Sequence, residues 1–349
     1  MRHHRRLCVM LGFAPVLGGM ARVASGQPAT CVSSGPANAI QGAVDAASPG
    51  DVISVGTSFF TGSICVTKPL VFAGIGPPGA TTVTGLSPFP SSSTTPTGVF
   101  HIAANVSGVV AFHNLVLVGV SDNTTPPAVV RGIYSAAPGA TLLLEGCDVR
   151  GADYNGAGDG GPGASGIEGV WSRLYVRDCA VSGGDAEASI FGGPGGEGGD
   201  AILAAPGAGE VVLAGTTLTG GDGGTTTGYS SPIGCILGAP GPGGSAIVAP
   251  NVWSWGSSGT GGLGGLQRDC NLQVVGSASP GAGHASPAPA DLTLGASAPL
   301  GGSASFTLSN PGGLLAAIAV STTGFSSPVP LPGFGPYFLG PSPVVFAGG

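Results

Sequence analysis

Charged side chains are scarce in this chain, and lysine is almost absent. Asp, Glu, Lys and Arg together make up 8% of the 349 residues, and Lys68 is the only lysine. Amphipathic helices are rich in Leu, Glu, Lys and Arg, and their apolar residues recur with a period of 3.6 positions. No long stretch of this sequence has that pattern, so a mainly helical fold is excluded and an all-β fold is expected.

Several other patterns are also missing. After residue 26, the longest plain apolar run is 314–320, which is far shorter than the roughly 18 residues that cross a bilayer. Cysteines at C-x₂-C zinc spacing, phosphate-binding glycine loops and Ser-His-Asp sets are not found. Glycine is abundant, with 68 residues, but it does not recur strictly at every third position, which excludes collagen.

The first 26 residues are typical of a secretory signal peptide. A basic start, MRHHRR, precedes the apolar segment LCVMLGFAPVLGGMA and the small residues Ala24, Ser25 and Gly26. Cleavage before Gln27 would leave six basic residues against all 17 acidic ones, a formal charge of −11. This predicts a secreted or cell-surface protein without a membrane span, and so acidic a chain is unsuited to nucleic acid.

Four short segments can be aligned residue by residue, namely 112–119, 144–151, 176–183 and 213–220. Their third residues are of the types that best tolerate a left-handed backbone: Asn114, Gly146, Asp178 and Gly215. Apolar residues flank this position in every copy: Phe112, Leu144, Val176 and Leu213 before it, and Leu117, Val149, Val181 and Leu218 after it. A strand, a one-residue bend and a second strand, repeated in register, predict the coils of a parallel β-solenoid.

Each repeat also has an upstream strand that is expected to open at an isoleucine. The five positions are Ile102, Ile133, Ile167, Ile202 and Ile247. They are 31, 34, 35 and 45 residues apart, so the extra length must lie in one loop of each coil.

The stretch 37–77 resembles the opening of right-handed parallel β-helix proteins of the pectin-lyase-like superfamily. The residues that carry this resemblance are Ile40, Gln41, Ala43, Val44, Asp45, Ala46, Ala47, Pro49, Gly50, Asp51, Lys68, Pro69 and Leu70. Together with the coils, the resemblance covers residues 37–275. It implies the architecture more than the activity, because this fold hosts lyases, hydrolases, esterases and non-catalytic surface proteins.

We therefore predict an all-β protein, a right-handed parallel β-helix of the non-catalytic exported bacterial type. The signal peptide is expected at 1–26, the β-helix with its glycine-rich loops at 27–285, and a small C-terminal β module of four to six strands at 286–349. A short helix at 38–47 would cap the open end of the stack, because a bare terminal coil exposes unpaired backbone and core.

Six cysteines follow residue 26, an even number that suits disulfides in an exported protein: Cys31, Cys65, Cys147, Cys179, Cys235 and Cys270. Cys147 and Cys179 hold equivalent positions in adjacent coils, about 4.8 Å apart, which predicts a bridge. The alternative is that both are reduced and fill the core. Cys235 and Cys270 can join two glycine-rich loops, and Cys31 and Cys65 bracket the first turn.

The resemblance also points to a place where catalysis would occur. Pectate and pectin lyases use an arginine or lysine, beside acids that hold calcium, on the outer face of the first strand of each coil. Here that face is expected to present Ala103, Tyr134, Glu168, Leu203 and Val248, with Arg131 and Asp200 one residue outside it. The motifs of polygalacturonases and pectin methylesterases are absent, and no pair of carboxylates suggests a glycosidase. Glu168 is therefore the one candidate catalytic acid.

Two loop features have open interpretations. Asp153, Asp185 and Asp222 each follow the second strand at the same interval, so their carboxylates either cap turns or bind calcium. Apart from this calcium candidate, no cofactor is expected. The loops at 155–166, 192–201 and 237–246 should lie side by side, backbone against backbone. They form either a flat surface for a glycan, a mineral or a protein, or merely tolerated insertions.

The remaining charges are expected to pair between coils. Glu145 with Arg177, and Arg173 with Glu210, should form cross-strand ion pairs, and His113 shares the column of Glu145. The sequence thus favours an exported protein with a structural or binding role at or outside the cell surface, whose partner is a polysaccharide or another cell-surface component. The alternative is a polysaccharide-active enzyme, a lyase or glycoside hydrolase.

Overall fold

The computed structural model describes residues 30–32, 38–85, 97–121, 130–154, 160–190, 192–232 and 234–285, and six short strands between residues 291 and 348. The chain divides into two compact units, one spanning residues 28–286 and the other including residues 287–349. The predicted signal peptide at 1–26 lies outside the described residues.

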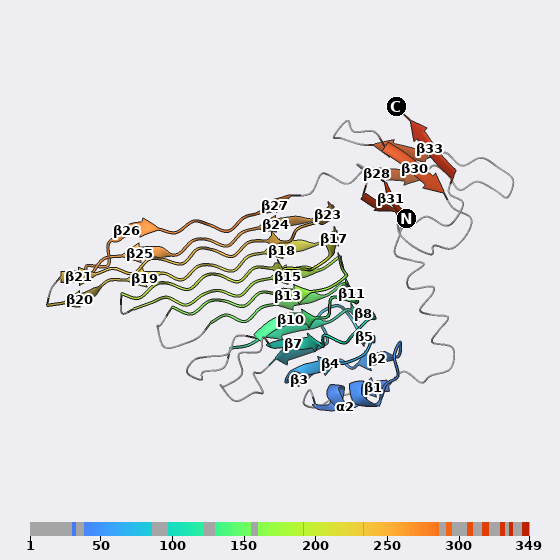
Figure 1. Ribbon diagram of the computed structural model, residues 1–349, viewed down its shortest axis with the longest axis horizontal. Helices are drawn as coiled ribbons and strands as arrows, with labels where there is room; N and C mark the ends of the chain where they lie inside the picture. The colour runs from blue at the N-terminus through green and yellow to red at the C-terminus, as the bar shows by residue number, and fades with distance from the viewer. Residues whose placement is uncertain are drawn as a thin grey trace, which may run out of the picture. The chain divides into compact units, whose positions relative to one another are not determined.

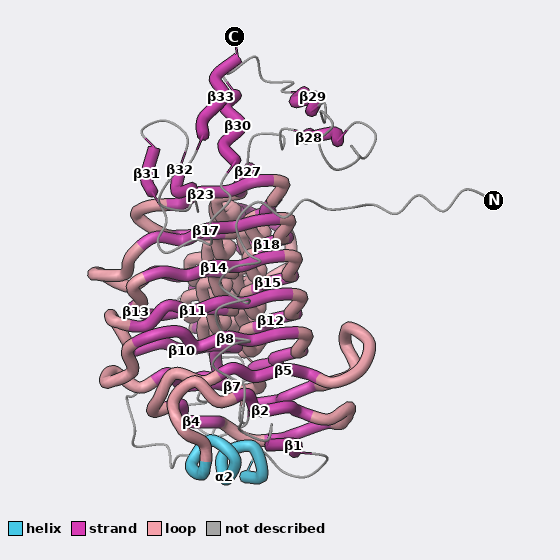
Figure 2. Tube along the Cα trace, turned by 90° about the vertical axis from the view of Figure 1, so that its right-hand side faces the viewer, coloured by secondary structure: helices cyan, strands magenta, loops and turns pink. Residues whose placement is uncertain are grey.

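The first unit is a parallel β-helix, in which three sheets are built from one strand of every coil (Figure 2). Sheet A contains β1 (Thr30–Val32), β2 (Val52–Val55), β5 (Val71–Gly74), β8 (Gly108–His113), β11 (Ala140–Glu145), β14 (Arg173–Arg177), β17 (Glu210–Ala214) and β23 (Val252–Trp255). Sheet B contains β3 (Phe59–Thr61), β6 (Thr82–Gly85), β9 (Val116–Gly119), β12 (Asp148–Arg150), β15 (Ala180–Ser182), β18 (Thr217–Thr219), β24 (Ser258–Thr260) and β27 (His284–Ala285). Sheet C contains β4 (Ile64–Val66), β7 (Thr97–Ile102), β10 (Val130–Ala136), β13 (Ile167–Val170), β16 (Ile202–Ala204) and β22 (Ile247–Val248).

The bend between sheets A and B recurs as the sequence predicts. The φ angles are 54° at Asn114, 61° at Gly146, 48° at Asp178 and 59° at Gly215. The four residues lie in successive layers, since the N–H of Asn114, Gly146 and Asp178 each bonds a carbonyl at the end of the next coil's sheet A strand. Gly256, with a φ of 56°, adds a fifth bend in the last coil. Only residues that accept a left-handed backbone can turn the chain here.

Apolar columns fill the inside of the coils. Phe112, Leu144, Val176 and Leu213 pair in sheet A, and Leu117, Val149, Val181 and Leu218 pair in sheet B, each with 1% or less of its surface exposed. Because each strand pairs with a neighbour on both sides, the core is one continuous cluster along the stack. The α-helix α2 (Asn38–Ala46) caps its first layer, with Ile40, Ala43 and Val44 buried, as predicted.

One register prediction was wrong by two residues. Phe100, not Ile102, pairs with Ile133 in sheet C, while Ile102 pairs with Ser135. Side chains alternate with a period of two along a strand, so a shift of two keeps both residues on the inner face. Phe100 and Ile102 are both fully buried. An alignment of Ile133 with Phe100 and one with Ile102 therefore give the same apolar pattern, and the sequence could not distinguish them.

The glycine-rich loops of the last four coils form a two-layer bundle that extends away from the β-helix (Figure 1). The chain runs out in one layer, through 183–189, 220–227 and 261–268, and returns in the other, through 192–201, 238–246 and 278–283. Within the outgoing layer, Gly183, Ala186 and Ser189 donate to carbonyls of the next coil at intervals of three residues. A three-residue repeat in an extended chain is the geometry of a threefold helix such as polyproline II.

Glycine is required where the two layers meet. The N–H of Gly199 bonds the carbonyl of Gly184, that of Gly221 bonds Gly199, and that of Gly244 bonds Gly221, each at 2.8 Å. A Cβ atom added at Gly199 or Gly221 would overlap a carbonyl oxygen of a neighbouring segment. The loops therefore pack backbone against backbone, as predicted, and in 192–200 only one residue in three has a side chain.

The far end of the bundle is held by short strands and a disulfide. β20 (Tyr229–Ser231) and β21 (Gly234–Ile236) form an antiparallel pair, and β19 (Thr226–Thr227), β25 (Leu266–Arg268) and β26 (Val274–Ser277) form a three-stranded sheet. Cys235 and Cys270 are bridged, with a Cα–Cα distance of 5.9 Å. The predicted link between two loops is confirmed.

The second unit contains three antiparallel strand pairs. They are β28 (Asp291–Leu294) with β29 (Phe306–Ser309), β30 (Ala316–Val320) with β33 (Val344–Gly348), and β31 (Val329–Leu331) with β32 (Gly335–Tyr337). These strands account for the short β segments expected in this part of the chain.

Candidate functional site

The outer face of sheet C presents one column of side chains across five coils. Over these five coils its members, paired in register, are His101, Tyr134, Glu168, Leu203 and Val248, and Cys65 of β4 continues the column next to His101. Four of the five were predicted from the sequence. At β7 the outward residue is His101 rather than the predicted Ala103, because the register is shifted by two residues. Had Phe100 been taken as the inward residue, the alternation of side chains would have placed His101 on the outer face.

Glu168 is held by an arginine from the preceding coil. Arg131 Nε donates to Glu168 Oε2 at 2.6 Å, and Arg131 Nη2 donates to Oε1 at 3.2 Å. About a fifth of each side chain is exposed. A planar guanidinium that binds both carboxylate oxygens is the strongest geometry for such a pair. Both carboxylate oxygens of Glu168 are therefore engaged by Arg131.

Two rings lie next to this ion pair. His101 and Tyr134 meet edge to face, with 5.2 Å between the ring centroids, and the Arg131 guanidinium lies 5.9 Å from the centroid of the Tyr134 ring. Burial lowers the pKa of His101, so its imidazole is neutral at neutral pH. The face thus combines two uncharged rings with a neutralised charge pair, which is a surface suited to contact a ring of mixed polarity.

Asp200 approaches the same face from the coil after Glu168. Its Oδ1 accepts the backbone N–H of Ser245 at 2.6 Å. Burial raises the pKa of Asp200, and the neighbouring Glu197 and Glu168 act in the same direction, while the bond from Ser245 opposes them. The surroundings of Asp200 therefore favour its protonated form.

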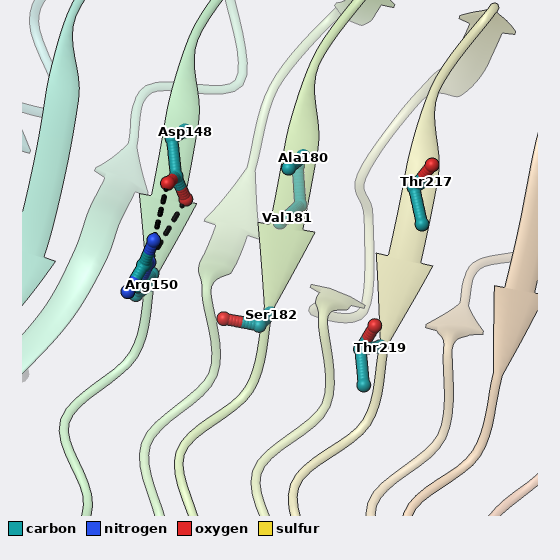
Figure 3. Close-up of a pocket in the computed structure, with 7 residues that line it drawn as sticks. All are labelled: Asp148, Arg150, Ala180, Val181, Ser182, Thr217 and Thr219. Carbon is teal, nitrogen blue, oxygen red and sulfur yellow. Dashed lines mark hydrogen bonds and ion pairs between the residues drawn. The ribbon is translucent and has the colours of Figure 1, made fainter. Parts of the chain in front are cut away.

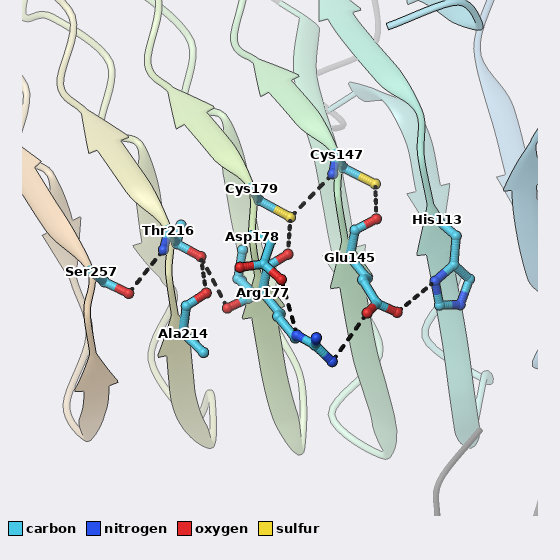
Figure 4. Close-up of polar contacts among 10 residues, drawn as sticks. His113, Glu145, Cys147, Arg177, Asp178, Cys179, Ala214, Thr216 and Ser257 are labelled. Carbon is cyan, nitrogen blue, oxygen red and sulfur yellow. Dashed lines mark hydrogen bonds and ion pairs between the residues drawn. The ribbon is translucent and has the colours of Figure 1, made fainter. Parts of the chain in front are cut away.

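The outer face of sheet A carries the predicted ion pairs. Glu145 lies 3.3 Å from His113 Nδ1 and 3.1 Å from Arg177 Nη1 (Figure 4). Arg173 lies 2.7 Å from Glu210. Burial lowers the pKa of His113 although Glu145 opposes this shift. Glu145 thus pairs with side chains of both adjacent coils, while the buried Nε2 of His113 has no hydrogen-bond partner among the described residues.

The predicted bridge between Cys147 and Cys179 is wrong, because both are buried and reduced. The N–H of Cys147 bonds the Cys179 sulfur at 3.3 Å, and the N–H of Thr216 bonds the Ser257 hydroxyl at 3.1 Å in the same column (Figure 4). In parallel strands the two side chains point the same way, so their Cβ atoms stay about 4.8 Å apart, beyond the usual disulfide range. The two thiols thus hydrogen-bond backbone groups at the buried bend between sheets A and B, as the hydroxyls of Thr216 and Ser257 do in the following coils.

The other cysteines do not add a site. Cys65 is exposed and reduced. The side chain of Cys31 lies outside the described residues, although β1 pairs with β2 through its backbone. Within the described residues, the one disulfide is Cys235–Cys270 at the tip of the bundle.

The three candidate calcium ligands form a ladder from coil to coil. The Oδ1 atom of Asp153 accepts the N–H of Asp185 at 2.9 Å, that of Asp185 accepts the N–H of Asp222 at 2.7 Å, and that of Asp222 accepts the N–H of Leu263 at 2.7 Å. All three side chains are exposed. Within the residues that the structure covers, no cluster of three or more metal-ligating side chains occurs. Each carboxylate therefore satisfies a backbone donor of the bundle.

No helix in the described segments is long and apolar enough to cross a membrane.

Comparison with known proteins adds little. No protein-family model matches the chain, and no curated protein matches it. Among solved structures, a mutant of the PL6 family alginate lyase AlyGC is 11% identical, with a TM-score of 0.29, over 66% of this chain and 37% of that one. ORF18 of Geobacillus virus E2 is also 11% identical, with a TM-score of 0.27, over 64% of this chain and 53% of that one. The chain thus spans about a third to a half of these proteins, and neither likeness is close enough to indicate a function.

Proposed function

We propose that this protein is exported and acts outside the cell as a non-catalytic β-helix of the pectin-lyase-like type, which contacts a polysaccharide through the outer face of sheet C. The observation that supports this best is the bidentate ion pair in which Arg131 donates to both oxygens of Glu168, next to the rings of Tyr134 and His101. The pair leaves a polar and aromatic surface, while the acid that could do chemistry is already engaged.

Export is supported by two features of different origin. The residues at 1–26 have the order of a signal peptide, basic then apolar then small. The Cys235–Cys270 disulfide suits an oxidising compartment outside the cytosol. In this proposal residues 27–285 form the secreted scaffold, and 286–349 form a separate β module.

One observation favours an enzyme as the second candidate. A carboxyl whose pKa is raised by its surroundings, next to a second carboxyl, is a common arrangement for acid catalysis. Burial raises the pKa of Asp200, whereas Glu168 is paired with Arg131. In a lyase or glycoside hydrolase, Asp200 would then be the proton donor beside Glu168.

A single set of measurements separates the two functions. The purified protein is offered a panel of neutral and acidic polysaccharides, and both binding and the appearance of reducing or unsaturated ends are followed. We expect binding without turnover, at least tenfold weaker in Tyr134→Ala. The matched control is Tyr229→Ala, because Tyr229 is an exposed tyrosine on β20 at the far end of the bundle.

Two outcomes would contradict the proposal. New chain ends that disappear in Glu168→Gln or Asp200→Asn would make the protein an enzyme. Binding that Tyr134→Ala leaves unchanged would show that the outer face of sheet C is not the contact surface.

A further inference from the structure

The outer face of sheet B has a trough that runs along one strand. The strands β12, β15 and β18 pair in register, so Asp148, Ala180 and Thr217 form one outward row, and Arg150, Ser182 and Thr219 form the next. The residues between the rows, Val149, Val181 and Leu218, point into the core. A hollow of about 230 Å³ lies over the middle strand (Figure 3).

The trough exists because the middle strand carries small side chains. Ala180 and Ser182 rise little above the sheet, while Asp148 and Arg150 form a higher wall on one side and Thr217 and Thr219 a low wall on the other. Neighbouring strands are about 4.8 Å apart, so the backbones of the two flanking strands are about 10 Å apart. That width admits one extended chain of small rings lying along the strand direction.

One wall is a paired charge. Arg150 Nε donates to Asp148 Oδ1 at 3.0 Å, and Arg150 Nη2 donates to Oδ2 at 2.5 Å. More than half of the Arg150 side chain, 56%, remains exposed. The guanidinium has five N–H donors, so donors remain that can point toward a ligand. The pair as a whole adds no net charge to this wall.

The opposite wall and the floor have a different chemistry. Thr217 and Thr219 are exposed and carry hydroxyls that both donate and accept, while the Cβ of Ala180 provides an apolar floor. A sugar ring needs this combination, with C–H groups against an apolar surface and hydroxyls toward polar rims.

The charges around the trough select among sugar polymers. The chains of the three strands continue into Asp153, Asp185 and Asp222, three residues after Arg150, Ser182 and Thr219. These exposed carboxylates stand at one end of the trough, where they repel a polyanion. We propose that this trough is a second binding site and that it takes a neutral, hydroxyl-rich glycan chain.

The site does not depend on the contact surface proposed for sheet C, because it lies on a different sheet with different residues. A variant that fills the trough tests it directly. Ala180→Phe places a ring over the middle strand at an exposed position. The matched control is Ala214→Phe, the same change at an outward position of sheet A, opposite Arg177.

Binding is measured by calorimetry with uncharged hexose oligosaccharides and with uronate oligosaccharides of equal length. We expect the Kd of the neutral oligosaccharides to rise at least tenfold in Ala180→Phe and to change less than twofold in Ala214→Phe. A second variant, Thr217→Val with Thr219→Val, removes both hydroxyls at nearly constant volume and should weaken binding by a similar factor. It also keeps the test decisive if Ala180→Phe fails to fold.

The outcomes separate the two proposals. Neutral glycan binding that both trough variants leave intact, but that Tyr134→Ala removes, would overturn the trough and keep the contact surface on sheet C. Loss in the trough variants alone would support the trough and remove the case for sheet C. Tighter binding of the uronates, or no binding of a neutral oligosaccharide, would overturn the trough.

Discussion

Asp185 Oδ1 accepts the backbone N–H of Asp222 at 2.7 Å, one coil further along the stack. The same bond is made by Asp153 below it and by Asp222 above it, so one aspartate per coil ties the outgoing layer of the bundle together. A side chain that bonds a backbone donor of the next coil stabilises the stacking of coils as well as its own turn.

Replacing Asp185 by alanine should therefore loosen this ladder, whereas replacing it by asparagine should not. The amide oxygen of Asn can accept the same N–H, and Ala cannot. We expect Asp185→Ala to lower the free energy of unfolding by about 1 kcal/mol, and Asp185→Asn to stay within about half of that. Urea denaturation of the three proteins measures this. Equal stability of the two variants would show that the carboxylate oxygen does not stabilise the bundle.

The same ladder leads to a prediction for calcium. Because one oxygen of each carboxylate already accepts a backbone N–H, we expect the melting temperature to be the same with calcium and with an excess of a chelator. Differential scanning calorimetry of the purified protein tests this. A clear fall of the midpoint on chelation would instead make Asp153, Asp185 and Asp222 a calcium site.

The bundle should not tolerate a methyl group between its layers. In Gly199→Ala the new Cβ would overlap the carbonyl oxygen of Ala164, and backbone cannot move aside as a side chain would. We expect a loss of about 1–3 kcal/mol, the usual cost of overpacking. Glu197→Ala is the control, because Glu197 lies two residues away on the same segment and points outward. If the two variants melted alike, the close approach of the layers would be refuted.

The register of sheet B can be tested with two neighbouring residues. Val181 is 1% exposed between Val149 and Leu218, and Ser182 faces outward. Val181→Asp should remove soluble protein, since an unpaired buried charge costs about 3–5 kcal/mol. Ser182→Asp should be secreted and melt almost as the unmodified protein does. The assay is the yield of folded protein in the medium, and a normal yield of Val181→Asp would disprove the register.

The pH dependence of stability should reflect Asp200. Burial raises its pKa in the folded state, so the folded protein binds this proton more tightly than the unfolded chain does. Its contribution is therefore favourable below the unfolded value near pH 4, and it is lost as pH rises through the higher folded value. We expect Asp200→Asn to melt at a higher temperature than the unmodified protein at pH 7, with the difference shrinking toward pH 4. A lower melting temperature at pH 7 would contradict this.

The sequence predicted the coils because their strongest signals are local. A left-handed bend restricts residue type at one position, so Asn114, Gly146, Asp178 and Gly215 mark the layers without knowledge of the fold. The alignment at β7 failed because a two-residue shift changes neither the apolar face nor the burial of Phe100 and Ile102. Only pairing across coils distinguishes the two alignments.

The site was harder to predict because it depends on where side chains point. Equivalent positions placed Cys147 beside Cys179 correctly, but parallel side chains keep their sulfur atoms from joining. The sequence put Arg131 one residue outside the face that carries Glu168. Its bidentate contact with Glu168 could not be predicted, because it depends on how far the arginine side chain extends toward the next coil. The trough was not predicted, although the aligned repeats contain it. At the outward positions of sheet B, Ala180 and Ser182 lie between Asp148 and Arg150 on one strand and Thr217 and Thr219 on the other.

The three-residue repeat of the bundle has a consequence for how this protein can diversify. In 194–199, two positions of every triplet are glycines at which a Cβ would overlap neighbouring backbone, while the third position carries an exposed side chain. These exposed positions are Pro194 and Glu197, whereas Asp200, the next in the series, is partly buried and bonds Ser245. Substitutions at such exposed positions can therefore change the charge or polarity of the bundle surface while its backbone stays the same, whereas the aspartates that bond the next coil cannot vary as freely.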